Sequence, residues 1–357
     1  MNQQIEPTFP LRIRRIVVGE AHPRRNGRIG RILAGLLSVV LMATFGHAEE
    51  KVIRVCRTGT MDFSSVQQAI DAVPEDNPQR IVIEIQPGTY KERIRVETSK
   101  PRITLRGADP DPRNTVLTFD LFAGSVVPPA TQPVGTSGSA STTILADDFH
   151  AENLTFENTA GQVGQAVALR ITGDRGVFRN CRFLGWQDTL CVDGGRQLFE
   201  RCYIEGRVDF IFGRSTAVFD HCEIRSKQGG YVTAARTPPH AKFGFVFLDC
   251  RLIGDDTPAF LGRPWQWDRG SNAAVAFIRC QMGPHIRPDG WNPWHLKDKQ
   301  NLEPQKVTRF REFGSMDLSG APLDVSGRVP WSQQLSPTEA AEYTRQNVLA
   351  GEDGWKP

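Results

Sequence analysis

Two aspartates in unusual surroundings, Asp188 and Asp209, lie 21 residues apart in the chain. Apolar and aromatic residues flank both of them, in the segments 185–190 and 208–213. A carboxylate in such surroundings loses its hydration unless another polar group pairs with it. Two carboxyl groups held close together cannot both ionise easily, so one remains a neutral acid while the other is an anion. Such a pair could supply an acid together with a nucleophile or base, and the residues alone leave open which aspartate takes which role.

The chain around the aspartates is a repeat with the pattern Phe-x-x-Cys-x-apolar. It occurs five times, and successive cysteines are 21, 20, 28 and 30 residues apart. The cysteines of the repeat are Cys181, Cys202, Cys222, Cys250 and Cys280. Alternating apolar and polar residues predict strands with one buried face. A period of 20–30 residues predicts a stack of coils that bury these faces against one another.

Three architectures have repeats of this kind. Leucine-rich repeats require a Leu-x-x-Leu-x-Leu ladder, which is absent here, and propeller blades require about 40 residues each. We therefore predict an all-β fold, a parallel β-helix, in which longer repeats are coils with inserted loops. In such a stack, Gln165, Asp188 and Asp209 would align on neighbouring coils.

The cysteines of the repeat would form an inward ladder with a spacing of about 4.8 Å. Two interpretations stay open, because stacked cysteines could form disulfides and a buried thiol also packs well as a small apolar group. Cys202 and Cys222 are the best candidates for a bridged pair. The chain has seven cysteines, so at least one of them is unpaired.

Both ends of the stack need covers. A capping-box pattern at 64–67 predicts a helix that buries one face and ends before Pro74. A second such pattern, Ser336-Pro337-Thr338-Glu339, predicts a helix that ends near Gly351. The segment 122–143, rich in Gly, Pro, Ser and Thr, is interpreted as a long loop that forms a cleft wall. These features indicate one catalytic domain, residues 49–357.

Residues 1–48 have the organisation of an export signal. A basic region ends at Arg31, an apolar run follows from 32 to 45, and small residues precede Glu49. The run is short for a membrane span, which needs about 20 residues, although an uncleaved anchor is the alternative. Seven arginines and two glutamates in this leader leave a net charge of −2 for the rest, which gives no support for nucleic-acid binding. We expect an exported protein, secreted or periplasmic, without an integral membrane domain.

Four further side chains complete a possible site. Gln165 and Gln187 could donate to a developing oxyanion, and Arg263 could pair with one aspartate and keep it ionised. Trp265 and Trp294 could stack on sugar faces, with ordinary packing as the alternative for both. The seven histidines are scattered and give no metal-ligand spacing. We therefore expect no metal and no cofactor.

The motifs around these residues resemble those of the pectin methylesterases, or pectinesterases. Four of them occur in the order and spacing of the family, and a fifth, 285–291, is similar to its bacterial branch. The four are Gln165-Ala-Val-Ala-Leu, Gly185-Trp-Gln-Asp-Thr-Leu, Val208-Asp-Phe-Ile-Phe-Gly and Leu261-Gly-Arg-Pro-Trp. The resemblance runs from about Val52 to Trp355. It implies a right-handed parallel β-helix with a cleft on one face.

The resemblance also implies a role for each site residue. Asp209 would attack the C6 methyl ester of a galacturonate unit, and Asp188 would protonate the leaving methanol and then activate water. Gln165 and Gln187 would stabilise the oxyanion. Arg263 would hold Asp209, and Trp265 would line the sugar subsites. The implied substrate is methyl-esterified homogalacturonan, and we expect a monomer.

Three other functions remain open at this stage. A lyase or glycosidase could act on the same polymer, although neither needs a pair of oxyanion-binding glutamines. An esterase or thioesterase could act on a different acyl substrate, because only the subsites would differ. A catalytically inactive, polysaccharide-binding β-helix could retain the cleft, although all five catalytic positions are intact.

Overall fold

The computed structural model describes residues 51–265, 272–294 and 308–357. The leader predicted at 1–48 lies outside these residues. None of the helices within them is long and apolar enough to cross a membrane.

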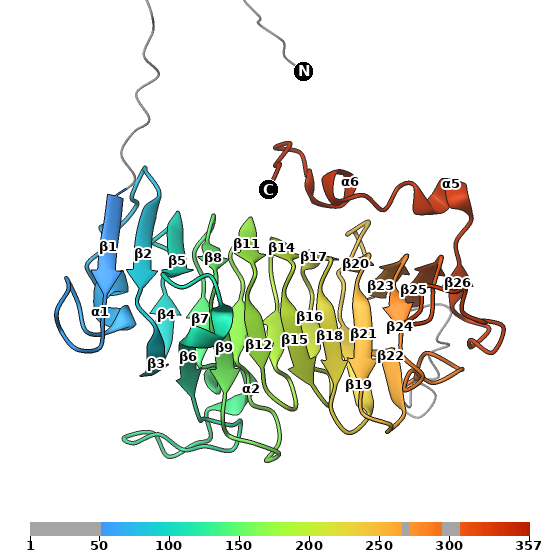
Figure 1. Ribbon diagram of the computed structural model, residues 1–357, viewed down its shortest axis with the longest axis horizontal. Helices are drawn as coiled ribbons and strands as arrows, with labels where there is room; N and C mark the ends of the chain where they lie inside the picture. The colour runs from blue at the N-terminus through green and yellow to red at the C-terminus, as the bar shows by residue number, and fades with distance from the viewer. Residues whose placement is uncertain (1–50, 266–271, 295–307) are drawn as a thin grey trace, which may run out of the picture. The chain divides into compact units, whose positions relative to one another are not determined.

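Three parallel sheets wind around a common core, and each coil from β2 to β22 contributes one strand to each sheet in turn (Figure 1). The predicted all-β, right-handed parallel β-helix is therefore confirmed. The eleven-stranded sheet contains β1 Lys51–Val55, β2 Ile81–Ile85, β5 Ile103–Gly107, β8 His150–Glu152, β11 Gly176–Arg179, β14 Arg196–Glu200, β17 Thr216–Asp220, β20 Phe245–Leu248, β23 Ala273–Ile278, β25 Thr308–Phe313 and β26 Gln333–Gln334.

The other two sheets follow the same winding. The eight-stranded sheet contains β3 Gly88–Lys91, β6 Thr115–Phe119, β9 Thr155–Asn158, β12 Arg182–Leu184, β15 Tyr203–Gly206, β18 Glu223–Ser226, β21 Arg251–Gly254 and β24 Gln281–Met282. The seven-stranded sheet contains β4 Ile94–Val96, β7 Thr142–Ile144, β10 Leu169–Ile171, β13 Leu190–Val192, β16 Ile211–Gly213, β19 Gly230–Ala235 and β22 Ala259–Pro264.

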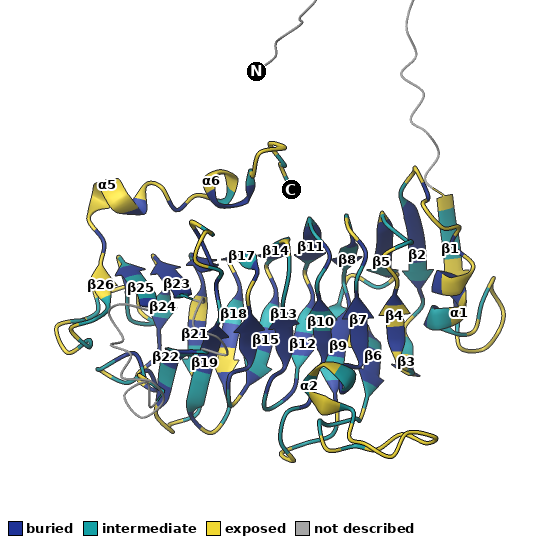
Figure 2. Cartoon of the chain, turned by 180° about the vertical axis from the view of Figure 1, so that it is seen from behind, coloured by how far each residue is buried: buried dark blue, intermediate teal, exposed yellow. Residues whose placement is uncertain are grey.

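The phenylalanines of the repeat form a continuous stack inside the coils. The rings of Phe178, Phe199, Phe219, Phe247 and Phe277 are fully buried. Successive centroids are 4.7, 4.8, 4.5 and 4.4 Å apart, with nearly parallel planes. This separation matches the distance between neighbouring strands, so one aromatic residue per coil fixes the register of the stack. Figure 2 shows the strands largely buried and the connecting loops more exposed.

The cysteines of the repeat form a second inward ladder, but they are not bridged. All seven cysteines are free, so the buried-thiol interpretation holds, and Cys202 and Cys222, the best candidates for a bridged pair, are not joined. The Cys222 thiol instead donates to the carbonyl oxygen of Phe199 at 3.3 Å. The reason is geometric, because residues stacked in register are about 4.8 Å apart and a disulfide requires about 3.8 Å between the two Cβ atoms.

The N-terminal end of the stack is covered by α1, Val66–Asp71, as predicted. Its N-cap is Ser65, whose side chain accepts from the Gln68 N–H. The Glu92 carboxylate accepts from the Ser65 hydroxyl at 2.6 Å and from the Val66 N–H at 2.9 Å. The helix buries Val66, Ala69 and Ile70 and therefore closes the core at the first coil.

The C-terminal segment departs from the predicted single capping helix. It forms two short helices, α5 Pro337–Ala340 and α6 Arg345–Leu349, and α5 has the predicted capping box at Ser336. Figure 1 shows both helices running back along the stack. Leu335, Ala340, Tyr343, Val348 and Leu349 pack on the outer face of the eleven-stranded sheet. That face presents apolar side chains on several strands, and the segment buries them instead of closing the last coil.

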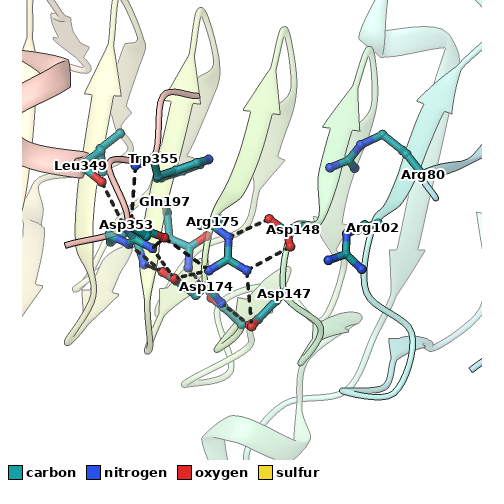
Figure 3. Close-up of polar contacts among 12 residues, drawn as sticks. Arg80, Arg102, Asp147, Asp148, Asp174, Arg175, Gln197, Leu349, Asp353 and Trp355 are labelled. Carbon is teal, nitrogen blue, oxygen red and sulfur yellow. Dashed lines mark hydrogen bonds and ion pairs between the residues drawn. The ribbon is translucent and has the colours of Figure 1, made fainter. Parts of the chain in front are cut away.

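A ladder of alternating charges anchors this segment at its far end (Figure 3). Arg175 binds Asp148 at 2.7 Å and Asp174 at 2.9 Å, and Arg196 binds both Asp174 and Asp353 at 2.5 Å. Arg196 also donates to the backbone carbonyls of residues 349 and 350. The ladder joins three successive turns of the stack to the end of the chain.

We expect Arg196→Gln to release the C-terminal segment, because Arg196 links it to the β-helix. The free energy of unfolding should fall by about 1–2 kcal/mol, and limited proteolysis should cut after residue 335 faster than in the wild type. Arg251→Gln removes a more exposed ion pair with Glu223 and should change neither readout. Equal proteolysis rates in both variants would contradict the anchoring role.

Candidate active site

The two aspartates occupy equivalent positions on adjacent coils. Asp188 lies two residues before β13 and Asp209 two residues before β16. The Asp188 N–H donates to the Val208 carbonyl at 3.0 Å. Both aspartates have left-handed backbones, with φ of 64° and 51°, which Asp tolerates better than most residues. The carboxyl groups therefore lie on neighbouring coils, as their spacing predicts.

Gln165 is one position away from its predicted alignment with the aspartates. Gln165 pairs with Gln187, and Gln187 in turn pairs with Val208. Asp188 and Asp209 each follow one residue later, so they align with each other and not with Gln165. The prediction was wrong by one residue because 23 residues separate Gln165 from Asp188, whereas this coil advances the chain by 22 residues. Neither side-chain amide has a hydrogen-bond partner within the described parts of the chain, and both line a cleft. Their N–H groups are therefore available to a bound molecule.

Arg263 reaches Asp209 from two strands away. Ala234 on β19 lies opposite both Arg263 on β22 and Phe212 on β16. The small Ala234 side chain leaves room for the arginine to cross β19. Its Nε donates to Asp209 Oδ1 at 2.8 Å and its Nη2 to Oδ2 at 2.6 Å. This two-point contact fixes the plane of the Asp209 carboxylate.

Two aromatic rings hold the guanidinium of Arg263 in place. The rings of Tyr231 and Trp294 each have their centroid 3.9 Å from its central carbon. Cation–π contacts of this kind favour a planar guanidinium. Trp294 was predicted as a sugar-stacking residue, and the contact seen here is with Arg263.

The electrostatic environments of the aspartates differ. Burial raises the pKa of Asp188 well above its usual range, and the neighbouring Asp209 raises it further, while Arg263 opposes the rise. Burial also raises the pKa of Asp209, but the hydrogen bonds and the charge of Arg263 oppose that rise directly. Asp188 therefore keeps its proton to higher pH than Asp209, which gives the acid and anion pair that the sequence suggested without assigning it.

The site opens into a cleft of about 590 Å³ on the outer face of the seven-stranded sheet. Cys191, Phe212 and Ala234 form an apolar surface there, against which Trp265 packs. The segment 134–137 lines one side, in agreement with the predicted cleft wall at 122–143. All seven residues predicted for the site line the cleft: Gln165, Gln187, Asp188, Asp209, Arg263, Trp265 and Trp294.

Three polar residues near the cleft were not predicted from the sequence: Asp193, Tyr231 and Arg236. Arg236 lies over the Trp265 ring, 4.8 Å from its centroid, and 3.7 Å from the Asp193 carboxylate. Tyr231 contacts the Arg263 guanidinium together with Trp294. Ala235 pairs with Pro264 on the neighbouring strand. Arg236 and Trp265 are the residues that directly follow these two strands, so they lie side by side. The irregular spacing of the later repeats conceals this register in the sequence.

One group among the described residues could offer three ligand atoms to a metal ion: Asp220, His221 and Asp249. It lies at the turns between the eleven- and eight-stranded sheets, outside the cleft. Both oxygens of Asp249 are bound by Arg279, at 2.8 and 2.6 Å. This arrangement satisfies the carboxylate without an ion.

Comparison with known proteins agrees with this geometry. The pectinesterase family model matches residues 52–352. Pectinesterase 31 of Arabidopsis thaliana is 40% identical over 309 residues, which are 85% of this chain and 93% of that relative. The structure of pectin methylesterase from carrot is 31% identical, with a TM-score of 0.75 over 84% of this chain and 93% of that chain.

A bacterial structure is also similar. Pectin methylesterase PemA from Erwinia chrysanthemi is 31% identical, with a TM-score of 0.72 over 86% of this chain and 98% of that chain. The similarity extends over the whole β-helix in each case. The chain therefore belongs to the pectinesterase family, whose members remove the methyl esters of pectin.

Proposed function

We propose that this chain hydrolyses the methyl esters of homogalacturonan through a covalent intermediate on Asp209, with Asp188 as general acid and base. The observation that carries the assignment is the two-point contact of Arg263 with Asp209, beside a buried Asp188 that has no ion-pair partner among the described residues. Arg263 favours the anion at Asp209, which suits a nucleophile. The raised pKa of Asp188 suits a proton donor near neutral pH.

The first step forms the covalent intermediate. One Asp209 oxygen attacks the C6 carbonyl carbon, and the carbonyl electrons move onto its oxygen. The amides of Gln165 and Gln187 donate to this oxyanion. The tetrahedral intermediate then collapses, the bond to the methoxy oxygen breaks, and Asp188 donates its proton to that oxygen. Methanol leaves, and Asp209 carries the sugar acyl group as a mixed anhydride.

The second step returns the enzyme to its starting state. Asp188, now an anion, takes a proton from a water molecule as its oxygen attacks the acyl carbon. The bond to Asp209 breaks, so Asp209 is again a carboxylate paired with Arg263 and Asp188 is again protonated. The products are one methanol and one galacturonic acid for each ester, the acid then loses its proton to solvent to give the carboxylate, and the cycle consumes one water.

The cleft suits a sugar polymer in shape and lining. Its volume of about 590 Å³ lies within the usual range for ligand sites. Trp265 offers an aromatic surface to a sugar face, and Trp294 contributes to the same wall while it holds Arg263. A pectin methylesterase 31% identical to this chain has been solved in complex with a hexasaccharide. We propose methylated galacturonan as the substrate of residues 49–357.

We further propose that residues 1–48 direct export and that the protein acts as a monomer, either secreted or in the periplasm. Pectin is an extracellular polymer, so its hydrolysis requires export. Mass spectrometry of the mature N-terminus would test the cleavage expected before Glu49. An intact Met1 on exported protein would instead indicate an uncleaved anchor.

The rate of methanol release should depend on pH in a bell-shaped manner. Activity requires ionised Asp209 and protonated Asp188, so it rises as pH passes the pKa of Asp209 and falls as pH passes that of Asp188. Both pKa values are raised, so both limbs should lie above the range of a free aspartate, about 3.9. A kcat/KM profile with no alkaline limb up to the denaturation of the protein would contradict the role of Asp188.

Arg263→Lys should lower kcat at least about 100-fold, because an ammonium cannot bind both oxygens or fit between two rings. Since Arg263 lowers the pKa of Asp209, its loss should also move the acid limb of the pH profile upward. Arg279→Lys is a matched control, because Arg279 binds Asp249 with the same two distances away from the cleft. An unchanged acid limb in Arg263→Lys would count against the pairing.

The overall proposal is tested by incubating the purified protein with highly methylated pectin in the presence of a chelator. We expect methanol and titratable acid in equal amounts, with no new unsaturated or reducing ends. Unsaturated ends would indicate a lyase, and new reducing ends would indicate a glycosidase. A folded protein that releases no methanol would point to another ester substrate or to a binding protein.

A further inference from the structure

The outer face of β25 carries two arginines that the active site does not use. Arg309 and Arg311 alternate along the strand with the inward-facing Phe310. On the neighbouring strand, β23, the residues opposite them are Ala274 and Ala276. Two methyl groups cannot fill the space that larger side chains would occupy, so the arginines border a recess over β23.

The C-terminal segment closes this recess. Tyr343 is buried and accepts a hydrogen bond from Arg311 Nη1, and its ring packs edge-on against Phe243 with centroids 5.3 Å apart. The backbone carbonyl of Lys242 accepts from Arg309 Nη1 at 2.8 Å. The recess has a volume of about 10 Å³, which is room for one water-sized particle.

Three nitrogen atoms of the arginines are buried without a hydrogen-bond partner among the described residues. They are Nε and Nη2 of Arg309 and Nε of Arg311. Both side chains line the recess. A buried donor without an acceptor costs about 1–3 kcal/mol, so three of them within one small recess indicate an acceptor that the protein does not itself provide.

The two arginines of the recess also lack a direct ion pair among the described residues, although Glu339 is close enough for its charge to act on Arg311. Among the described residues, no carboxylate lies within ion-pair distance of Arg309 or Arg311. The nearby C-terminal carboxylates bind elsewhere, Glu339 to the Ser336 N–H at 2.8 Å and Glu342 to Lys242 at 3.3 Å. Burial lowers the pKa of Arg309, and the charge of Arg311 lowers it further. The two guanidinium groups thus repel each other across a partly dehydrated space.

We propose that this recess binds one small inorganic anion of the halide class, such as chloride, between Arg309, Arg311 and Tyr343. A single-atom anion can accept from all three unpaired nitrogen atoms and offsets part of the repulsion between the guanidinium groups. A water molecule is neutral, accepts at most two hydrogen bonds, and would leave one donor unsatisfied. Polyatomic anions such as sulfate are too large for the volume. The anion would join the last coils to the C-terminal segment, independently of the catalytic cleft.

Thermal unfolding of the purified protein in sodium chloride or sodium gluconate, at constant ionic strength, tests this site. Tm should rise with chloride and, above the Kd, by about 2 °C for each tenfold increase in its concentration. Bromide should act similarly. In Arg309→Gln this dependence should disappear, whereas in Arg251→Gln, which removes a partly exposed ion pair elsewhere, it should persist.

A second measurement covers the case in which Arg309→Gln does not fold. Crystals of the wild-type protein soaked in bromide should give an anomalous peak between the guanidinium groups of Arg309 and Arg311. Identical melting in chloride and gluconate, together with no bromide peak, would mean that the recess holds a water only and would overturn the proposal. Chloride-dependent stability that survives in a folded Arg309→Gln would also overturn it.

Discussion

Asp209→Ala is expected to lower kcat for methanol release by about 10⁴-fold or more. The variant loses the only oxygen nucleophile that Arg263 holds in a fixed plane, through contacts of 2.8 and 2.6 Å. Methylated oligogalacturonate should still bind, because the aromatic walls and the glutamine amides are intact. The measurement is a comparison of kcat with the oligosaccharide Kd determined by calorimetry.

Removal of Asp209 leaves Arg263 without its counter-ion, so the stability of the variant must be measured beside its activity. Asp209→Asn keeps the shape and one hydrogen bond and should be equally inactive, which separates loss of the nucleophile from loss of packing. Asp249→Asn disrupts the equivalent pair with Arg279 and should retain full activity. A folded Asp209→Asn with more than a few per cent of wild-type kcat would refute the nucleophile assignment.

Asp188→Asn is expected to lower kcat by about 10²–10⁴-fold, the usual contribution of a general acid or base. An amide of the same shape can neither protonate methanol nor activate water. The two steps can be separated with an aryl ester of an oligogalacturonate, because a phenolate leaves without protonation. The variant should release about one equivalent of phenol rapidly and then turn over slowly, since the second step still requires a base.

Equal slowing of both steps with the aryl ester would show that Asp188 only positions other groups. The Asp188→Asn variant should also show a pH profile without the alkaline limb, because no proton donor is left to titrate. Retention of that limb would assign it to a different group. These readouts distinguish a proton-transfer role from a structural one.

Much of this architecture could be predicted from the repeat. The Phe-x-x-Cys-x-apolar pattern has one aromatic and one thiol per coil; the predicted inward ladder of cysteines is present, and the phenylalanines form a second ladder that was not predicted. The 21-residue spacing placed Asp188 and Asp209 on adjacent coils for the same reason. A repeat with a nearly constant period fixes which residues stack, provided that no residue is inserted between them.

The errors arose where the length of a coil changes, or where the contact depends on distances that the repeat period does not give. The coil after Gln165 advances the chain by 22 residues, so Gln165 pairs with Gln187 and not with Asp188, which is 23 residues away. The spacing of the cysteine ladder suggests that neighbouring thiols could form a disulfide, but cysteines stacked in register are too far apart for one. The C-terminal segment was predicted to cap the stack, and it covers the outer face of a sheet because that face is apolar. The support of Arg263 by Tyr231 depends on long-range register that sequence spacing alone does not give.

The most direct test of the central claim, a covalent intermediate on Asp209, is hydroxylamine trapping during turnover of methylated pectin. Hydroxylamine that attacks the Asp209 carbonyl of the mixed anhydride releases the galacturonate carboxylate and leaves a hydroxamate on the enzyme. We predict substrate-dependent inactivation, with the hydroxamate found by peptide mass spectrometry at Asp209. A hydroxamate at Asp188 would contradict the mechanism, and so would sustained methanol release in hydroxylamine with neither aspartate modified and no hydroxamate on the sugar product.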